Sequence, residues 1–251
     1  MALAFVLNTK SEILKIRKTA AYWLTIAGAA LVPLMMTAAY ILRPDVFVPG
    51  MKADPWTRHL MGCWESAAAF LLPMYVILVT SLVVQTEYKN NTWKQVYATP
   101  RSYGDIYFSK FLVIHLLILS CFILFNTLVL LGGLLTGLLN ADYHFLESTV
   151  PWKTMLILGS KLYVSILGIT AIQYWLSLRL KNYIMPLGIG LALLITGLII
   201  LRWDKVIYFP YAYTTLTYIK AGNKHEYYSL IWFAVITMLG FIDTINRKER
   251  G

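Results

Sequence analysis

Six long runs of uncharged, mostly apolar residues occupy most of the chain and limit what it can fold into. They cover residues 22–42, 66–85, 111–141, 162–178, 182–201 and 227–242. A helix that crosses a bilayer needs about 17 to 25 such residues, at about 1.5 Å of rise each. The composition agrees, because 59% of the 251 residues are hydrophobic and only 14% are charged, whereas soluble domains carry about a quarter charged residues. The chain is therefore expected to cross a membrane several times.

We expect one all-α, polytopic transmembrane domain over residues 1–251, with six spans. The predicted spans are 22–42, 62–86, 107–138, 154–178, 182–201 and 227–245. The third run is too long for one perpendicular crossing, so either the helix tilts or residues 132–141 lie in the far interface. Gly133 and Gly137 form a GxxxG pattern in this run, which indicates close helix packing inside the subunit, with a dimer seam as the alternative.

The lysines and arginines favour an orientation with both termini in the cytosol. In that orientation, thirteen of the 22 lie on the inner side and eight on the outer side, while Lys161 lies inside a span. Cytosolic loops carry the excess of positive charge in membrane proteins. We expect a multi-pass protein of the inner, cytoplasmic membrane, whose net charge of +10 also attracts anionic lipid headgroups. No nucleic acid partner is expected, because the sequence has no soluble basic domain.

Residues 1–21 precede the first span and are too polar and basic for a cleavable signal peptide. On a helical wheel, one face gathers Phe5, Val6, Thr9, Ile13, Ile16 and Ala20. The basic residues outside this face are Lys10, Lys15, Arg17 and Lys18. The pattern predicts a helix that lies in the inner membrane interface, although Leu7 and Leu14 depart from it. A continuous extension of the first span is the alternative.

The polar interruption at residues 87–106 is the segment best suited to contact another protein. Its pattern predicts a helix of about two turns, too short to be stable without a surface to dock on. Its Trp and Tyr are residue types that anchor protein interfaces. In the alternative interpretation, both rings simply lie among the lipid headgroups. The pattern consists of Asn91 or Thr92 as the helix cap, Trp93, Val96 and Tyr97 as an apolar stripe, and Thr99 and Pro100 as the stop.

Several chemically distinctive side chains lie in or beside the spans. His115 favours a hydrogen bond between helices, with a functional role in the membrane as the alternative. Lys161 either extends its amine towards the interface or lines a wet pathway, and its own span holds no acidic residue. Cys63 and Cys121 fit small buried hydrophobes, and the histidines and cysteines lack the spacing of a metal site. The sequence also lacks a phosphate-binding P-loop motif, so this chain is not expected to bind ATP itself.

Residues 202–226 form an outer loop with too many aromatics for a free aqueous tether. They are Trp203, Tyr208, Phe209, Tyr211, Tyr213 and Tyr218. Because Pro210 interrupts any single helix, we expect a re-entrant loop of two short segments that dips into the outer leaflet and roofs the seam between two subunits. Phe209, Pro210 and Tyr211 are then candidates for a gate. The alternative is an ordinary aromatic belt at the membrane surface.

Several segments resemble one family of membrane proteins. Residues 87–112 resemble the signature of type-2 ABC exporter permeases: an acidic residue ending the second span, a Thr-led short helix, an Ala-Thr-Pro stop and a lysine, Lys110, opening the third span. Residues 12–18 are similar to the basic interfacial helix of that family. Residues 208–213 and the pair Trp93-Lys94 resemble the bacitracin and lantibiotic-immunity branch.

The resemblance implies a non-enzymatic permease subunit of an ATP-driven exporter. The subunit would pair with a second permease, identical or homologous, and recruit two copies of an ABC ATPase that bind ATP and Mg²⁺. The substrate would be amphipathic: a peptide antibiotic, a drug or a lipid. A membrane anchor that holds an ATPase for a mechanical, sensory or assembly role is the alternative. The residues implied to contact the ATPase are Glu87, Asn91, Thr92, Trp93, Val96, Tyr97, Thr99 and Pro100.

Overall fold

A computed structural model describes residues 2–51, 53–89, 102–180, 182, 184–219 and 224–246. All elements in this part of the chain are helical. Most of the predicted ATPase-contacting segment lies outside the described residues: Asn91, Thr92, Trp93, Val96, Tyr97, Thr99 and Pro100. Of that set, the structure describes Glu87.

Six helices are long and apolar enough to cross a membrane, which confirms the predicted all-α, six-span architecture. They are α2 (Ala20–Leu42), α4 (Pro55–Ser66) continued through the π-helical turn η1 (Ala67–Leu71) into α5 (Leu72–Lys89), α7 (Tyr103–Leu139), α8 (Trp152–Arg179), α9 (Ile184–Ile199) continued by η3 (Ile200–Arg202), and α11 (Lys224–Asn246). The second span begins at Pro55, earlier than predicted, because proline fits the first turn of a helix and the Asp54 carboxylate accepts a hydrogen bond from the Thr57 N–H.

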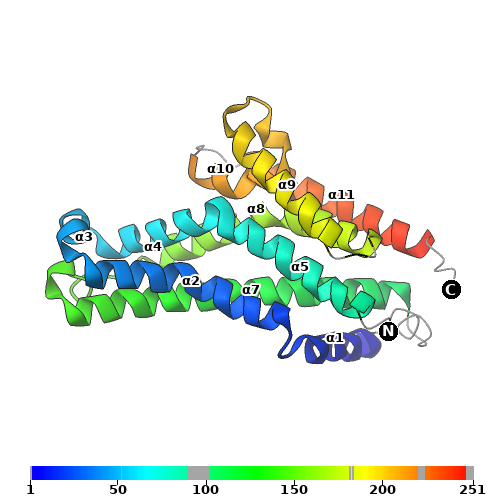
Figure 1. Cartoon of the computed structure of the whole chain (residues 1–251), viewed down its shortest axis with the longest axis horizontal. Coiled ribbons are helices and arrows are strands. Elements are labelled where there is room, and N and C mark those ends of the chain that lie inside the picture. Colours follow the sequence, from blue (N-terminus) through cyan, green and yellow to red (C-terminus); the bar gives the residue numbers. More distant parts are fainter. Residues whose placement is uncertain are drawn as a thin grey trace.

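Shorter helices complete the structure. They are α1 (Ala2–Ile16), α3 (Pro44–Met51), η2 (Ala141–Tyr143), η4 (Val206–Tyr208), η5 (Pro210–Ala212) and α10 (Tyr213–Ile219). α1 and the end of α11 lie at the same end of the bundle (Figure 1). This end is called the terminal end below.

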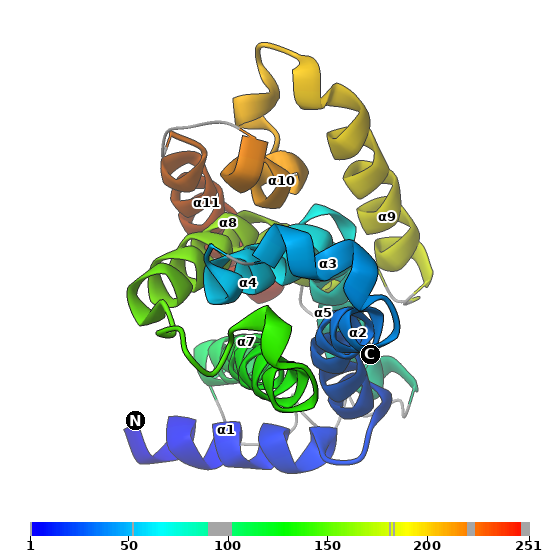
Figure 2. The same ribbon diagram turned by 90° about the vertical axis from the view of Figure 1, so that its left-hand side faces the viewer.

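The long helices form two pairs that meet in the middle. α2 packs along α7, and α8 packs along α11. α5 joins the two pairs, because it contacts both α2 and α8. Figure 2 shows α9, α10 and α11 gathered on one side of α8, and α1, α2 and α7 on the other. The largest buried side chains between them are apolar or aromatic, so the helices associate through close side-chain packing.

α7 is one continuous helix of 37 residues. It exposes apolar side chains near both ends, with Phe108 36% exposed and Leu139 62% exposed. Helical rise separates these two residues by about 47 Å, well beyond the roughly 30 Å of a hydrocarbon core. One perpendicular crossing is therefore too short for this helix, and the choice between a tilted crossing and an end in the far interface stays a prediction.

The GxxxG pattern of α7 packs within the subunit. A Cβ atom added at Gly133 would lie 2.6 Å from the Trp56 ring, and one added at Gly137 would lie 2.9 Å from the Phe145 Cβ. Both approaches are closer than van der Waals contact allows, so only glycine fits at these positions. The interpretation as internal packing is confirmed for these contacts.

α1 runs across the direction of the long helices, as an interfacial helix does (Figure 2). It ends at Ile16, earlier than predicted, because Lys18 adopts the left-handed conformation with φ 64° and turns the chain into α2. The predicted apolar face is wrong in detail. The face buried against α7 includes Asn8, Thr9, Glu12 and Ile16, whereas Val6 and Ile13 are exposed.

A π-helical turn marks the junction of α4 and α5. The Leu72 N–H donates to the Ala67 carbonyl, five residues back. Pro73 has no N–H for the Ala69 carbonyl, which instead accepts a hydrogen bond of 3.5 Å from the Thr215 hydroxyl of α10. The distortion is therefore stabilised by the chain segment that follows α9.

Candidate functional site

Four charged side chains on three helices form the most highly charged buried feature of the described structure. Glu12 and Lys15 lie about one turn apart on α1. Glu87 lies near the end of α5, and Lys110 lies near the start of α7. We call these four residues the ion cluster.

Each lysine of the ion cluster contacts both carboxylates. The Lys15 Nζ lies 2.7 Å from the Glu12 Oε1 and 2.7 Å from the Glu87 Oε1. The Lys110 Nζ lies 2.5 Å from the Glu12 Oε2 and 3.2 Å from the Glu87 Oε1. The alternation of positive and negative groups leaves the cluster without net charge.

Burial makes the mutual pairing of these charges essential. Glu87 is 1% exposed and Lys110 is 2% exposed, and removing one partner from such a buried pair typically costs about 3 to 5 kcal/mol. Lys15 is more open. Partial burial lowers the pKa of its amine, but hydrogen bonds to Glu12 and Glu87 outweigh this and hold the pKa above its ordinary value. The stability that Lys15 contributes is therefore present at neutral pH and is lost only as the pH rises through this raised pKa.

The ion cluster spans the two ends of the predicted coupling segment. Glu87 precedes residues 90–101 and Lys110 follows them, while Glu12 and Lys15 hold α1 beside both. The start of α7 is fixed by the Ser102 hydroxyl, which accepts a hydrogen bond from the Asp105 N–H. The ion pairs therefore join α1, α5 and α7 on both sides of residues 90–101 in the sequence.

Two other candidates make contacts elsewhere. The His115 Nδ1 lies 2.9 Å from the Tyr163 hydroxyl, which confirms the predicted hydrogen bond between helices. Lys161 is paired by a different helix: its Nζ lies 4.0 Å from the Glu226 Oε1 of α11. The sequence pattern did not indicate this acidic neighbour. The described contacts do not join His115, Lys161 and the ion cluster into one site.

The segment between α9 and α11 enters the bundle. Pro210 packs near Gly168 of α8, and Tyr211 is 1% exposed. The Tyr211 hydroxyl donates a hydrogen bond of 3.3 Å to the Gln173 Oε1. Gln173 lies six residues before Arg179, the last residue of α8, which corresponds to about 9 Å of helical rise. Phe209 is half-buried beside them. The segment is not an aqueous tether, and its predicted roof over a seam between two subunits stays a prediction.

Gln173 is a central polar residue that the sequence did not suggest. It is fully buried, and its Nε2 donates to the Pro186 carbonyl at 2.6 Å and to the Ser81 hydroxyl at 3.2 Å. With Tyr211, it links α5, α8, α9 and η5. A buried amide with all of these partners fixes a specific arrangement of helices.

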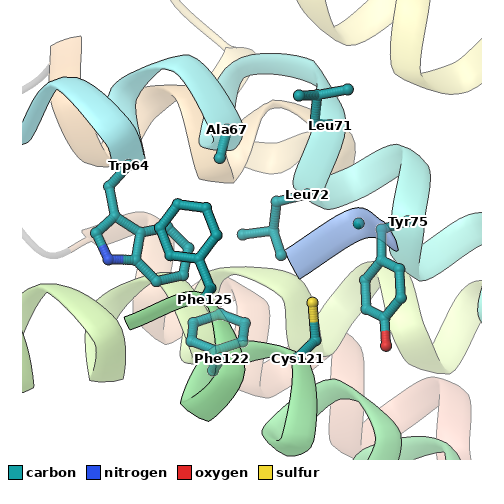
Figure 3. A pocket seen from close by; sticks show the side chains of 9 residues that line it. Trp64, Ala67, Leu71, Leu72, Tyr75, Cys121, Phe122 and Phe125 are labelled. Atoms are coloured by element: carbon teal, nitrogen blue, oxygen red, sulfur yellow. The ribbon is translucent and has the colours of Figure 1, made fainter. Parts of the chain in front are cut away.

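An apolar crevice lies beside the π-helical turn (Figure 3). The space between its side chains measures about 310 Å³, including the part that opens outwards. Its polar atoms already have partners, because the Tyr75 hydroxyl bonds to the Leu117 carbonyl and the Trp64 N–H to Asn126. The lining therefore offers mostly apolar surface. The lining residues are Gly28, Trp64, Ala67, Leu71, Leu72, Tyr75, Cys121, Phe122 and Phe125.

The sequence interpretation singled out Glu87 but missed how its partners come together. One signal was present: Glu12 is the only acidic residue before Asp45. The family signature places Lys110 at the start of the third span but does not indicate its counter-charge. A lone acid on a basic helix and a lysine at the start of a span each need a counter-charge when buried.

The described residues thus define a multi-pass helical membrane protein in which no group of His, Cys, Asp and Glu side chains could hold a metal ion. A family model, described as ABC-2 family transporter protein, matches residues 9–197, and the chain belongs to this family. The match includes the ion cluster. It confirms the predicted superfamily, whereas the bacitracin and lantibiotic-immunity branch stays a prediction. A comparison with curated proteins gave no match. Membership implies association with a membrane and with an ABC ATPase.

Proposed function

We propose that this chain is the permease subunit of an ATP-driven exporter, and that the ion cluster transmits movement of the ATPase to the membrane helices. The observation that carries the proposal is the position of the cluster. It lies at both ends of the segment expected to contact the ATPase, in a chain of the ABC-2 transporter family.

The proposed coupling follows from the contacts. Lys110 pairs with Glu87 across the coupling segment and with Glu12 of α1. When the ATPase moves residues 90–101, α5 and α7 cannot separate without breaking buried ion pairs. They therefore move as one body with α1, and their length carries the displacement across the membrane. The ATPase binds ATP and Mg²⁺, and this chain performs no catalysis.

The proposed assembly contains two permeases, identical or homologous, and two ATPases. The substrate is amphipathic: a peptide antibiotic, a drug or a lipid. This proposal rests on the resemblance of the loop segments and on the extent of lipid-facing helix surface.

We expect cells that lack the chain to become several-fold more sensitive to at least one membrane-active peptide or drug. Sensitivity is compared between cells with this chain and its ATPase, cells without the chain, and cells whose ATPase lacks its phosphate-binding lysine. Equal sensitivity in all three, with the ATPase still bound, would instead support a membrane anchor.

In the proposed orientation the chain lies in the inner, cytoplasmic membrane and both of its termini are in the cytosol. Single cysteines replace Ser11, Ser102 and Asn223 in a background in which Cys63 and Cys121 are alanine. An impermeant thiol reagent added to intact cells should label only the Asn223→Cys variant, and permeabilised cells should show labelling of all three. The reverse pattern in intact cells would overturn both the orientation and the coupling proposal, because the ATPase acts from the cytosol.

A further inference from the structure

α1 has two faces with opposite surroundings. One face carries Glu12 and packs against α7 through the ion cluster. The other face is apolar and open: Val6 is 60% exposed, Leu7 56%, Ile13 46% and Leu14 60%. The described structure does not cover this outward face.

Basic side chains lie within the outward face. Lys10 lies on α1 between the apolar residues of this face, and Arg17 directly follows the last residue of the helix; both side chains are exposed. The single acidic residue of the first 44, Glu12, is buried on the opposite face. The outward face therefore combines exposed apolar side chains with positive charge that no other residue of α1 offsets.

The position of α1 indicates a lipid surface. The chain enters α2 at Ala20, directly after α1. Two exposed aromatics, Tyr22 and Trp23, follow at the start of that span, at 38% and 59% exposure, and such rings mark the headgroup level. An amphipathic helix at this level places its apolar side chains below the headgroups and its basic side chains among them.

We propose that the outward face of α1 binds anionic phospholipids. Lys10 and Arg17 contact the phosphate headgroups, and the apolar residues of this face lie among the upper acyl chains. Bound lipid fixes the position of α1 and thereby stabilises the contacts of Glu12 and Lys15 with α5 and α7. The charge of the lipid around the protein then regulates the ion cluster. This inference does not require the proposed transport activity, and its test contains no ATPase.

The experiment measures which lipid touches α1. A fluorophore is attached at Leu14→Cys in the Cys63→Ala, Cys121→Ala background. The purified full chain is reconstituted in phosphatidylcholine vesicles that contain an equal fraction of either brominated phosphatidylglycerol or brominated phosphatidylcholine. A basic residue at an anionic surface gives about fivefold lipid enrichment, so we expect quenching by the anionic lipid to be at least about twofold stronger. High salt should reduce the difference.

Charge-matched variants show whether the lipid preference comes from the outward face of α1 or from the general attraction of a basic protein to anionic lipid. Lys10→Gln with Arg17→Gln should abolish the preference, whereas Lys153→Gln with Arg202→Gln, which removes the same charge elsewhere, should preserve it. Equal quenching by both lipids, or a preference that survives the first pair of substitutions, would overturn the proposal. Quenching by neither lipid would do so as well, since it would mean that a protein surface covers this face.

The link to the ion cluster has its own measurement. Hydrogen exchange of the α1 backbone amides should be several-fold slower in vesicles with phosphatidylglycerol than in phosphatidylcholine alone, and Lys10→Gln with Arg17→Gln should remove the difference. Unchanged exchange despite a lipid preference would overturn the regulatory part. Because these readouts involve neither ATPase nor substrate, failure of the proposed function leaves them unaffected.

Discussion

Replacing Lys110 with methionine should lower the melting temperature of the detergent-purified protein by about 6 to 20 °C. The substitution keeps most of the side-chain volume but leaves the buried Glu12 and Glu87 carboxylates with Lys15 alone between them. Leaving a buried charge without its partner typically costs about 3 to 5 kcal/mol. In a chain of this size, each kcal/mol shifts the melting temperature by about 2 to 4 °C. Thermal unfolding followed by size-exclusion chromatography measures the shift.

Two further variants show whether the loss comes from the ion cluster. Lys10→Met removes the same charge from an exposed position and should change the melting temperature little, because exposed charges contribute less than about 1 kcal/mol. Adding Glu87→Gln to Lys110→Met restores the balance of charge and should recover part of the loss. If Lys110→Met behaves like Lys10→Met, the ion cluster does not hold α1, α5 and α7 together.

The double substitution Trp93→Ala with Tyr97→Ala should abolish recovery of the ATPase with the permease while leaving the permease folded. Both rings lie in the segment outside the described residues, in the coupling helix that the sequence predicts. An aromatic anchor at the centre of an interface contributes about 2 kcal/mol or more. Losing two anchors weakens binding by a factor of about a thousand. Co-purification in detergent measures the ATPase that remains bound.

The matched control removes the same two ring types from another part of the chain. Trp203→Ala with Tyr227→Ala alters side chains that are 55% and 69% exposed, outside the coupling segment. This variant should retain the ATPase. Undiminished recovery with Trp93→Ala and Tyr97→Ala would rule out the docking role and favour the interpretation in which those rings lie among lipid headgroups.

The helical wheel predicted the protein-facing side of α1 only in part. The wheel placed Val6 and Ile13 on one face with Thr9 and Ile16, because it grouped apolar residues. In the structure, Thr9 and Ile16 share the protein-facing side with Glu12, and Val6 and Ile13 face outwards. In a membrane protein, lipid accepts apolar side chains as readily as a protein core does, so hydrophobicity alone does not say which face packs.

The helical class, the six spans and the family could be predicted from the amino-acid sequence, because each span must carry its own run of apolar residues and satisfy its own backbone. The partners of the buried polar groups depend on how the helices pack and could not be predicted in this way. Glu12 meets Lys110, Lys161 meets Glu226, and Gln173 meets Tyr211, each pair from segments far apart in the chain. Hydropathy depends on local composition, whereas a buried charge or amide is satisfied by whichever helix the packing brings beside it.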